Sequence, residues 1–229
     1  MGGRARRIGT RWRGVVRVPL VLACASAVVV ACGPVGSTDT TSSTAPAGVI
    51  VSELGPDSIY RGAELTTPYR MPNLVLRSSA GGRFNLTTDT TRPVTLVFFG
   101  YTNCPDVCPL VMSDLTAAVV QLSAEVRDRT SLLFITTDPA RDSPETLRRY
   151  LDRYSDRFIG LTGPRAKIVR AAEQMGVPVG TASRLPSGGY DVSHGAQVIG
   201  FRGDAAPVVW TQGTPVEDLV ADITTLARS

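Results

Sequence analysis

The sequence predicts an α/β fold in which helices cover a central mixed sheet. Short apolar runs alternate with helix-like segments from residue 93 onward, a pattern typical of strands followed by helices. This series closes with two successive strand-like segments and a last helix, which gives a mixed sheet. The hydrophobic share of 43% of the 229 residues is enough for a sizeable core.

The first half of the series contains two buried strands, each followed by a helix. Residues 93–100, PVTLVFFG, form an apolar run with β-branched and aromatic residues, as expected of a central strand. A helix is predicted from Leu110 over LVMSDLTAAVVQLSAEV, and residues 131–138, SLLFITTD, are the second strand. The next helix, over SPETLRRYLDRY, begins with Ser143 as N-cap, followed by proline and glutamate.

The second half adds a strand, a helix, a hairpin and a final helix. RFIGLTG is a short strand, and the helix over RAKIVRAAEQMG ends at Gly176. GAQVIGF and APVVWTQG form a hairpin around residues 202–205, and the last helix begins at a capping box of Thr214 and Glu217. This order is that of thioredoxin-like folds, with an N-terminal β-hairpin extension over residues 73–86.

The N-terminal segment is predicted to be a secretory signal. Six of the 24 basic residues lie before position 18, where no acid occurs, and they precede the apolar run VPLVLACASAVVVA. This run is too short for a comfortable transmembrane helix, and its composition is typical of a signal peptide. The remaining 18 basic residues are balanced by 20 acidic ones, which argues against a nucleic-acid partner.

The apolar run ends in VVAC, which resembles a bacterial lipobox and predicts acylation of Cys32. Cys24 is a weaker candidate because its apolar run is shorter, and an uncleaved anchor with an incidental Cys32 is the alternative. The expected organisation is a signal peptide over residues 1–31, a flexible tether and extension over 32–65, and a folded domain over 66–229. We expect this domain at the extracytoplasmic face of the bacterial cell membrane, held by the lipid anchor.

Two cysteines remain in the folded domain, Cys104 and Cys108, in FFGYTNCPDVCP. They are a structural staple, a redox couple or a pair of metal ligands, although a core of this size needs no staple. Their i, i+4 spacing places the Cα atoms roughly 6 Å apart, within reach of a disulfide. Pro109 favours a helix start near itself, so Cys108 is expected close to the N-cap, where the helix dipole lowers the pKa of a thiol.

A metal site built on two thiolates needs a further ligand, and the one histidine of the chain is the candidate. Soft thiolates select Cu(I), zinc or iron–sulfur clusters. His194 lies in YDVSHGAQVIG, just before a late strand, and an isolated histidine is usually structural. In a thioredoxin-like sheet, however, the loop entering this strand lies beside the cysteine loop. Two thiolates and one imidazole suit Cu(I), and the same set with a weak extra ligand suits Cu(II).

Other polar residues near the cysteines have weaker assignments. Asp138 closes the second strand at the same edge of the sheet, where its carboxylate is either a weak ligand, a hydrogen-bonding partner of the site, or a turn former before proline. Arg141 and Asp142 are expected to form an exposed pair. Tyr101 is a candidate lid over the sulfurs.

The motifs FFGYTNCPDVCP, TTDPARDSPETLRRYL, FIGLTG and YDVSHG, in this order, resemble those of the Sco/SenC family of copper-binding cytochrome c oxidase assembly proteins. The resemblance implies a thioredoxin fold in which Cys104, Cys108 and His194 bind copper. It also implies delivery of copper to the dinuclear copper site of the copper-bearing oxidase subunit, or preparation of its thiols. The chain departs from the family in having Ser193 and Gly195 around the histidine, where Asp and Ser are usual, and FITTD in place of the commoner Val-Asp ending.

Two functions therefore compete. The first is a copper metallochaperone, without turnover, whose partners are the oxidase subunit and either a thiol reductant or another copper chaperone. The alternative is a membrane-tethered thiol–disulfide reductase that keeps the cysteines of an acceptor reduced. Both need Cys104 and Cys108, but only the first needs His194. Dedicated oxidoreductases usually carry the tighter C-x-x-C spacing, and the additional residue here leaves the sulfurs more room for chelation.

Overall fold

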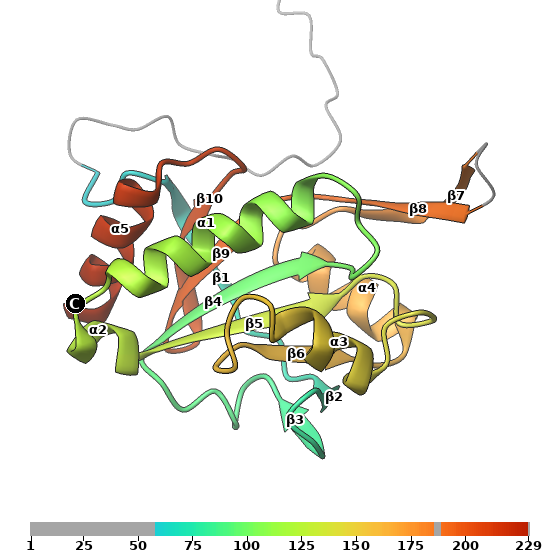
Figure 1. Cartoon of the computed structure of the whole chain (residues 1–229). Helices are drawn as coiled ribbons and strands as arrows, with labels where there is room; N and C mark the ends of the chain where they lie inside the picture. The colour runs from blue at the N-terminus through green and yellow to red at the C-terminus, as the bar shows by residue number, and fades with distance from the viewer. Residues whose placement is uncertain (1–57, 186–188, 229) are drawn as a thin grey trace, which may run out of the picture. The chain divides into compact units, whose positions relative to one another are not determined.

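The computed structural model describes residues 58–185 and 189–228, which all belong to one compact unit (Figure 1). The predicted signal peptide, Cys24, Cys32 and most of the predicted tether lie outside the described residues.

Eight of the strands form one mixed sheet. They are β1 (Ala63–Arg70), β2 (Val75–Ser78), β3 (Arg83–Asn85), β4 (Val94–Gly100), β5 (Thr130–Thr136), β6 (Ile159–Thr162), β9 (Val198–Arg202) and β10 (Ala205–Trp210). Their order across the sheet is β1-β10-β9-β4-β5-β6-β2-β3. β4 pairs in parallel with β5, and β5 with β6, whereas the other neighbours are antiparallel. The predicted mixed sheet is confirmed.

Helices cover both faces of this sheet because its central strands are apolar on both sides. Every residue of β4 is buried, and its side chains alternate between the two faces. Phe98 packs in the core beneath α1 (Val107–Gln121), α2 (Ala124–Asp128), α3 (Pro144–Leu151) and α5 (Val216–Arg228). Phe99 packs on the other face, which α4 (Arg165–Gln174) covers. Among the described helices, none has both the length and the apolar character needed to cross a bilayer.

The topology brings distant parts of the chain to one edge of the sheet. β4 and β5 run in parallel, so the loop before α1 and the loop after β5 both leave from that edge. β9 pairs antiparallel with β4, and Val198 at its start lies opposite Phe98 near the end of β4. The segment that enters β9 therefore arrives beside the cysteine loop, as expected from the sequence.

A separate ribbon precedes β9. The strands β7 (Val179–Leu185) and β8 (Gly189–His194) pair antiparallel as a two-stranded sheet that projects beyond the main sheet (Figure 1). The sequence does not predict this hairpin, because the segment GTASR lacks the alternation of apolar residues that marks a half-buried strand. β1 is also unexpected, and it begins within the segment assigned to the tether and extension.

Several local predictions are confirmed. Ser143 caps α3, since its side chain accepts a hydrogen bond from the amide of Thr146. Gly176 follows the end of α4 with a φ of +69°, the left-handed conformation that glycine favours. The hairpin over residues 73–86 is present as β2 and β3, and so is the hairpin of β9 and β10.

Three helix boundaries differ from the predictions. The single helix expected from Leu110 is two helices, because α1 ends at Gln121 and Ser123 caps α2. α1 begins at Val107, two residues before Pro109, so Cys108 lies in its first turn, close to the N-cap Asp106 as predicted. The capping box at Thr214 is wrong. The Thr214 hydroxyl donates to the carbonyl of Thr211, and α5 begins at Val216, one residue later than a cap at Thr214 implies.

Candidate metal centre

Cys104 and Cys108 lie at the junction between β4 and α1. Cys104 is half-buried in the loop, Cys108 is fully buried in the first turn of the helix, and both are free thiols. Gly100 permits this close approach, since a Cβ at that position would stand 3.0 Å from the Sγ of Cys108 and 3.0 Å from the ring of Phe134. The end of β4 is thus shaped to bring α1 close to the sheet.

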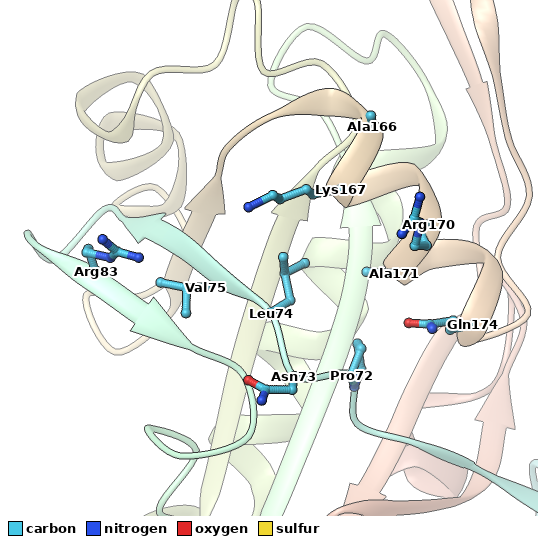
Figure 2. A pocket seen from close by; sticks show the side chains of 10 residues that line it. All are labelled: Pro72, Asn73, Leu74, Val75, Arg83, Ala166, Lys167, Arg170, Ala171 and Gln174. Carbon is cyan, nitrogen blue, oxygen red and sulfur yellow. The ribbon is translucent and has the colours of Figure 1, made fainter.

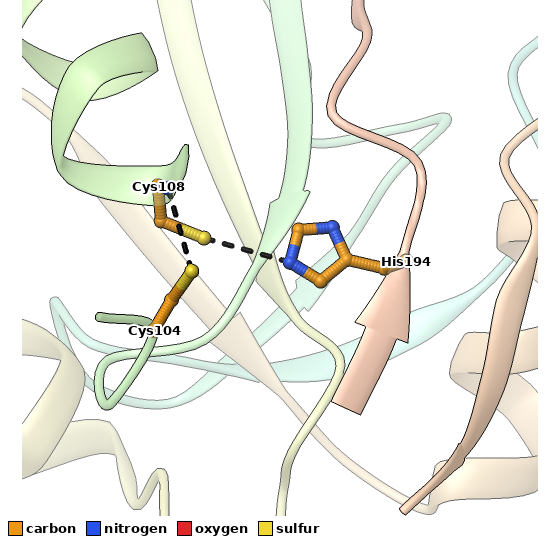
Figure 3. Close-up of side chains that lie close together, drawn as sticks. All are labelled: Cys104, Cys108 and His194. Atoms are coloured by element: carbon orange, nitrogen blue, oxygen red, sulfur yellow. Dashed lines mark hydrogen bonds between the residues drawn. The ribbon is translucent and has the colours of Figure 1, made fainter. Parts of the chain in front are cut away.

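His194 reaches the same place from the end of β8. Its Nε2 lies 3.5 Å from the Sγ of Cys108, although 86 residues separate the two in the chain (Figure 3). Its Nδ1 lies 2.9 Å from the carbonyl oxygen of Gly195, which can only accept, so Nδ1 carries a proton and Nε2 is the ring nitrogen that faces the sulfurs. The rings of Phe98 and Tyr101 stand edge-on to the imidazole, with centroids 6.3 Å and 5.7 Å away. These contacts fix the orientation of the ring.

The structure brings together the three residues that the sequence singled out. The two sulfurs and one ring nitrogen lie within 4.8 Å of one another, and they are the one such group among the described residues. This donor set fits a soft or borderline metal ion, because thiolates and imidazole together are typical ligands of copper and zinc. A pocket of about 340 Å³ opens onto Cys104 and His194, so the site can be reached from solvent.

The two thiols differ strongly in acidity. Hydrogen bonds from the Cys108 thiol, from His194 and from the backbone amides of Cys108 and Asp106 lower the pKa of Cys104 to about 3, against the opposing effect of burial. The hydrogen bond to Cys104, followed by burial, raises the pKa of Cys108. The expectation of a lowered pKa at Cys108 is therefore wrong. The amide at the start of α1 points at the sulfur of Cys104, and the sulfur of Cys108 lies in the core.

Asp138 does not belong to the group of three. Its carboxylate forms an ion pair with Arg141, and its carbonyl accepts hydrogen bonds from the amides of Arg141 and Asp142, as in a turn. The guanidinium of Arg141 lies over the ring of Tyr101, 5.6 Å from its centroid. Tyr101 in turn lines the pocket and contacts the imidazole, so it borders the site at the histidine.

Asp142 is the residue near the site that the sequence places incorrectly. It is not exposed but fully buried, and the ion pair that the structure gives Arg141 is with Asp138. Its carboxylate accepts hydrogen bonds from the amide of Thr102 (3.0 Å), the hydroxyl of Thr102 (2.6 Å) and the hydroxyl of Thr136 (2.6 Å). Asp142 therefore ties the cysteine loop to the end of β5. In the sequence, Asp142 resembles any aspartate in a turn, because the residue pattern TTDPARDSP does not distinguish a buried aspartate from an exposed one.

A larger pocket, of about 630 Å³, lies between α4 and the hairpin of β2 and β3 (Figure 2). Figure 2 shows Lys167 extending from α4 over Leu74 and Val75, with Arg83 on the other side. Its lining contains no cysteine or histidine, so the chemistry of thiolate and imidazole belongs to the smaller pocket.

Comparison with known proteins places most of the described domain in one family. The SCO1/SenC family model matches residues 75–228. A putative copper-binding protein of Stutzerimonas stutzeri is 43% identical over 99 residues, which cover 43% of this chain and 48% of that protein. Protein SenC of Rhodobacter capsulatus is 41% identical over 102 residues, or 41% of this chain and 46% of that protein. The chain thus spans less than half the length of these two curated relatives.

Solved structures match over a larger share. Apo Sco1 from Thermus thermophilus is 28% identical with a TM-score of 0.65, covering 75% of this chain and 99% of that one. Yeast Sco1 with copper bound is 26% identical with a TM-score of 0.62, covering 71% of this chain and 90% of that one. The predicted thioredoxin-like fold is confirmed by these likenesses.

Proposed function

The chain belongs to the SCO1/SenC family, and from this premise we propose that it is a copper metallochaperone that carries its ion on Cys104, Cys108 and His194. The observation that carries the proposal is the convergence of two sulfurs and one ring nitrogen within 4.8 Å. Copper bound to a relative of the same fold, yeast Sco1, supports copper as the cargo.

The arrangement suits both oxidation states of copper. Two thiolates can hold Cu(I), which favours soft ligands and low coordination numbers, and the imidazole supplies the nitrogen donor that Cu(II) prefers. Cys104 is already a thiolate at neutral pH because its pKa is lowered to about 3. Cys108 keeps its proton in the metal-free protein and must release it when the ion binds, since the thiolate is the form that binds metal.

The difference in burial between the two cysteines suggests how the ion leaves. Cys104 and His194 line the open pocket, whereas Cys108 is buried behind them. Ligands of an acceptor can approach the ion only from the pocket, so they displace His194 or Cys104 first. We propose that the acceptor is the copper-bearing subunit of cytochrome c oxidase, as the family resemblance implies. A thiol reductant or another copper chaperone would regenerate or load the site.

We also propose that the domain works at the extracytoplasmic face of the cell membrane. The basic start, the short apolar run and the VVAC ending before Cys32 support a lipoprotein signal and an acyl anchor. The Ser- and Thr-rich residues 36–48 would form part of a tether between the anchor and the domain.

The alternative, a thiol–disulfide reductase, is less well supported. Such an enzyme requires the two cysteines but not an imidazole with its Nε2 directed at one of them. The direction of His194 Nε2 and its 3.5 Å distance from the Sγ of Cys108 therefore favour metal binding.

Metal analysis of the reduced protein after addition of copper tests the proposal. The expected result is one copper ion per chain and, for Cu(II), an absorption band from thiolate-to-copper charge transfer. A protein that retains no copper after desalting, or that binds it equally well when both cysteines are blocked, would refute the metallochaperone function.

A further inference from the structure

We propose that Arg165 is a positioning residue for the proposed copper site: it holds the β7–β8 hairpin against the end of β5 and thereby keeps His194 facing the two cysteines. This inference rests on the proposed function, because it assumes that His194 is a copper ligand. The position of His194 can nevertheless be measured in the metal-free protein.

The hairpin needs such a support because His194 is its last residue. In the register of the hairpin, His194 lies opposite Val179 at the start of β7. Among the described strands, β7 and β8 pair only with each other and not with the main sheet. The ladder of the main sheet therefore does not fix the place of the imidazole, and other contacts at the base of the hairpin must do so.

Arg165 supplies a hydrogen-bonded link between this hairpin and the end of β5, in addition to the packing of Val179 against the core. One guanidinium nitrogen donates to the carbonyl of Gly180 in β7 (2.6 Å), and the other donates to the carbonyl of Thr137, directly after β5 (2.8 Å). The side chain is half-buried, and it spans three segments: α4, β7 and the end of β5. A planar guanidinium can bind two carbonyls at once in a fixed geometry, which the point charge of a lysine does not reproduce.

The segment that Arg165 contacts is also the one that holds the cysteine loop. The amide of Thr137 donates to the carbonyl of Gly100 at the end of β4 (2.7 Å). The hydroxyl of Thr136 donates to Asp142, which accepts two further hydrogen bonds from Thr102, two residues before Cys104. The loop that carries the cysteines and the hairpin that carries the histidine are thus both attached to residues 136–137. Their common support sets the distance between imidazole and sulfurs before a metal arrives.

A second set of contacts closes the base of the hairpin. The amide of Gly195 donates to the carbonyl of Pro178 (2.9 Å), and the side-chain amide of Gln197 donates to the carbonyl of Gly176 (2.7 Å). These bonds hold the two ends of the hairpin together, but they do not join it to β5. Loss of Arg165 should therefore leave the hairpin folded and let it shift relative to the cysteines.

The single histidine of the chain makes this shift measurable without copper. Selective labelling of histidine in the untagged, reduced protein gives one ring, whose nuclear Overhauser effects to the rings of Tyr101 and Phe98 report its position. We expect Arg165→Met to weaken these effects and to increase the mobility of the ring. Arg165→Lys keeps the charge but not the planar guanidinium that binds two carbonyls, so its nuclear Overhauser effects should be intermediate between those of the wild type and Arg165→Met. Arg170→Met is the matched control, since Arg170 is an exposed residue of the same helix that lines the other pocket.

Copper binding provides the second readout. Loss of a partly buried hydrogen-bonded arginine should weaken Cu(II) binding, which needs the imidazole, by about tenfold. Cu(I), held by the two thiolates, should be affected by no more than about twofold. Arg170→Met should change neither affinity.

The outcomes separate the two proposals. Unchanged ring contacts in Arg165→Met would overturn the role of Arg165, whether or not copper binds. If Arg165→Met fails to fold, Arg165→Lys decides, and wild-type contacts in that variant would equally overturn it. Wild-type protein that binds no copper would refute the metallochaperone function, while the metal-free comparison would still decide whether Arg165 positions His194.

Discussion

The backbone amide of Cys108 donates a hydrogen bond to the Sγ of Cys104, 3.4 Å away. The first turn of α1 thus directs a free N–H group, and the positive end of its dipole, at a sulfur that lies outside the helix. Cys104 accepts further hydrogen bonds from the Cys108 thiol and from His194. The i, i+4 spacing of the two cysteines therefore produces one thiolate and one thiol in the metal-free protein.

The first prediction concerns the pH dependence of this pair. Because the pKa of Cys104 is about 3 in the folded protein, its alkylation by iodoacetamide should proceed at a nearly constant rate from about pH 5 to about pH 8. Cys108, whose pKa is raised, should react slowly over the whole range. Mass spectrometry of the modified peptides of the reduced, metal-free protein measures both rates. A Cys104 rate that climbs about tenfold per pH unit, as for an ordinary thiol, would contradict the prediction.

The lowered pKa of Cys104 also makes the stability of the fold depend on pH, and the sign follows from the folded and unfolded pKa values of this thiol. Between the folded pKa of about 3 and an unfolded value of about 8.5, the unfolded chain binds a proton at Cys104 that the folded chain has lost. The free energy of unfolding contributed by this group therefore rises with pH across that window and is lost as the pH falls toward 3. Cys108 acts in the opposite sense, since its raised pKa lowers stability above the unfolded value.

The second prediction concerns the buried carboxylate of Asp142. Asp142→Asn places an amide where three donors converge, so at least one hydrogen bond is lost and a buried donor is left without a partner. We expect a loss of about 2 kcal/mol in the free energy of unfolding, measured by urea denaturation of the reduced protein. Amide hydrogen exchange at Thr102 should also become faster, because the cysteine loop loses its attachment to β5.

Asp204→Asn is the matched control for Asp142→Asn. Asp204 pairs with Arg70 on the surface, with side chains 68% and 71% exposed, and an exposed pair of this kind contributes about 0–1 kcal/mol. If Asp142→Asn costs no more than this control, the carboxylate does not hold the cysteine loop as described.

Much of the fold follows from local patterns that survive in the structure. β4 and β5 are continuous apolar runs because both of their faces are covered, and Ser143 and Gly176 mark helix ends through their own side-chain and backbone chemistry. The approach of His194 to the cysteine loop could be predicted because strand order brings the segment before β9 to that edge of the sheet. β9 lies beside β4, so whatever precedes β9 arrives at the end of β4.

The parts that the sequence misses depend on tertiary contacts. The sequence around Asp142 would be the same whether its side chain were solvated or buried. Burial is favourable only because Thr102 and Thr136 are placed to donate hydrogen bonds to its carboxylate. The assignment of the low pKa to the wrong cysteine arises in the same way. The low pKa belongs to the sulfur that faces the amide at the start of α1, and the sequence does not show in which direction each side chain points.

The third prediction concerns the proposed lipid anchor. Cys32→Ala removes the only thiol that follows the VVA sequence, so the protein should leave the membrane fraction or remain unprocessed. Fractionation and immunoblotting of cells that produce the variant measure both effects. Cys24→Ala is the control and should behave as wild type. Normal processing and membrane retention of Cys32→Ala would show that the lipoprotein assignment is wrong.

The last prediction separates the chaperone from the reductase through His194. His194→Ala removes the nitrogen donor but leaves both thiols, so Cu(I) binding should fall only in part, while Cu(II) binding and its charge-transfer band should be lost or strongly altered. Cys104→Ser, in contrast, removes the thiolate and should impair both copper binding and thiol chemistry. In cells grown at limiting copper, we expect both variants to reduce cytochrome c oxidase activity if copper transfer is the task. Normal oxidase activity in His194→Ala, together with loss of activity in Cys104→Ser, would refute the chaperone function, because a thiol–disulfide reductase needs the cysteines and not the imidazole.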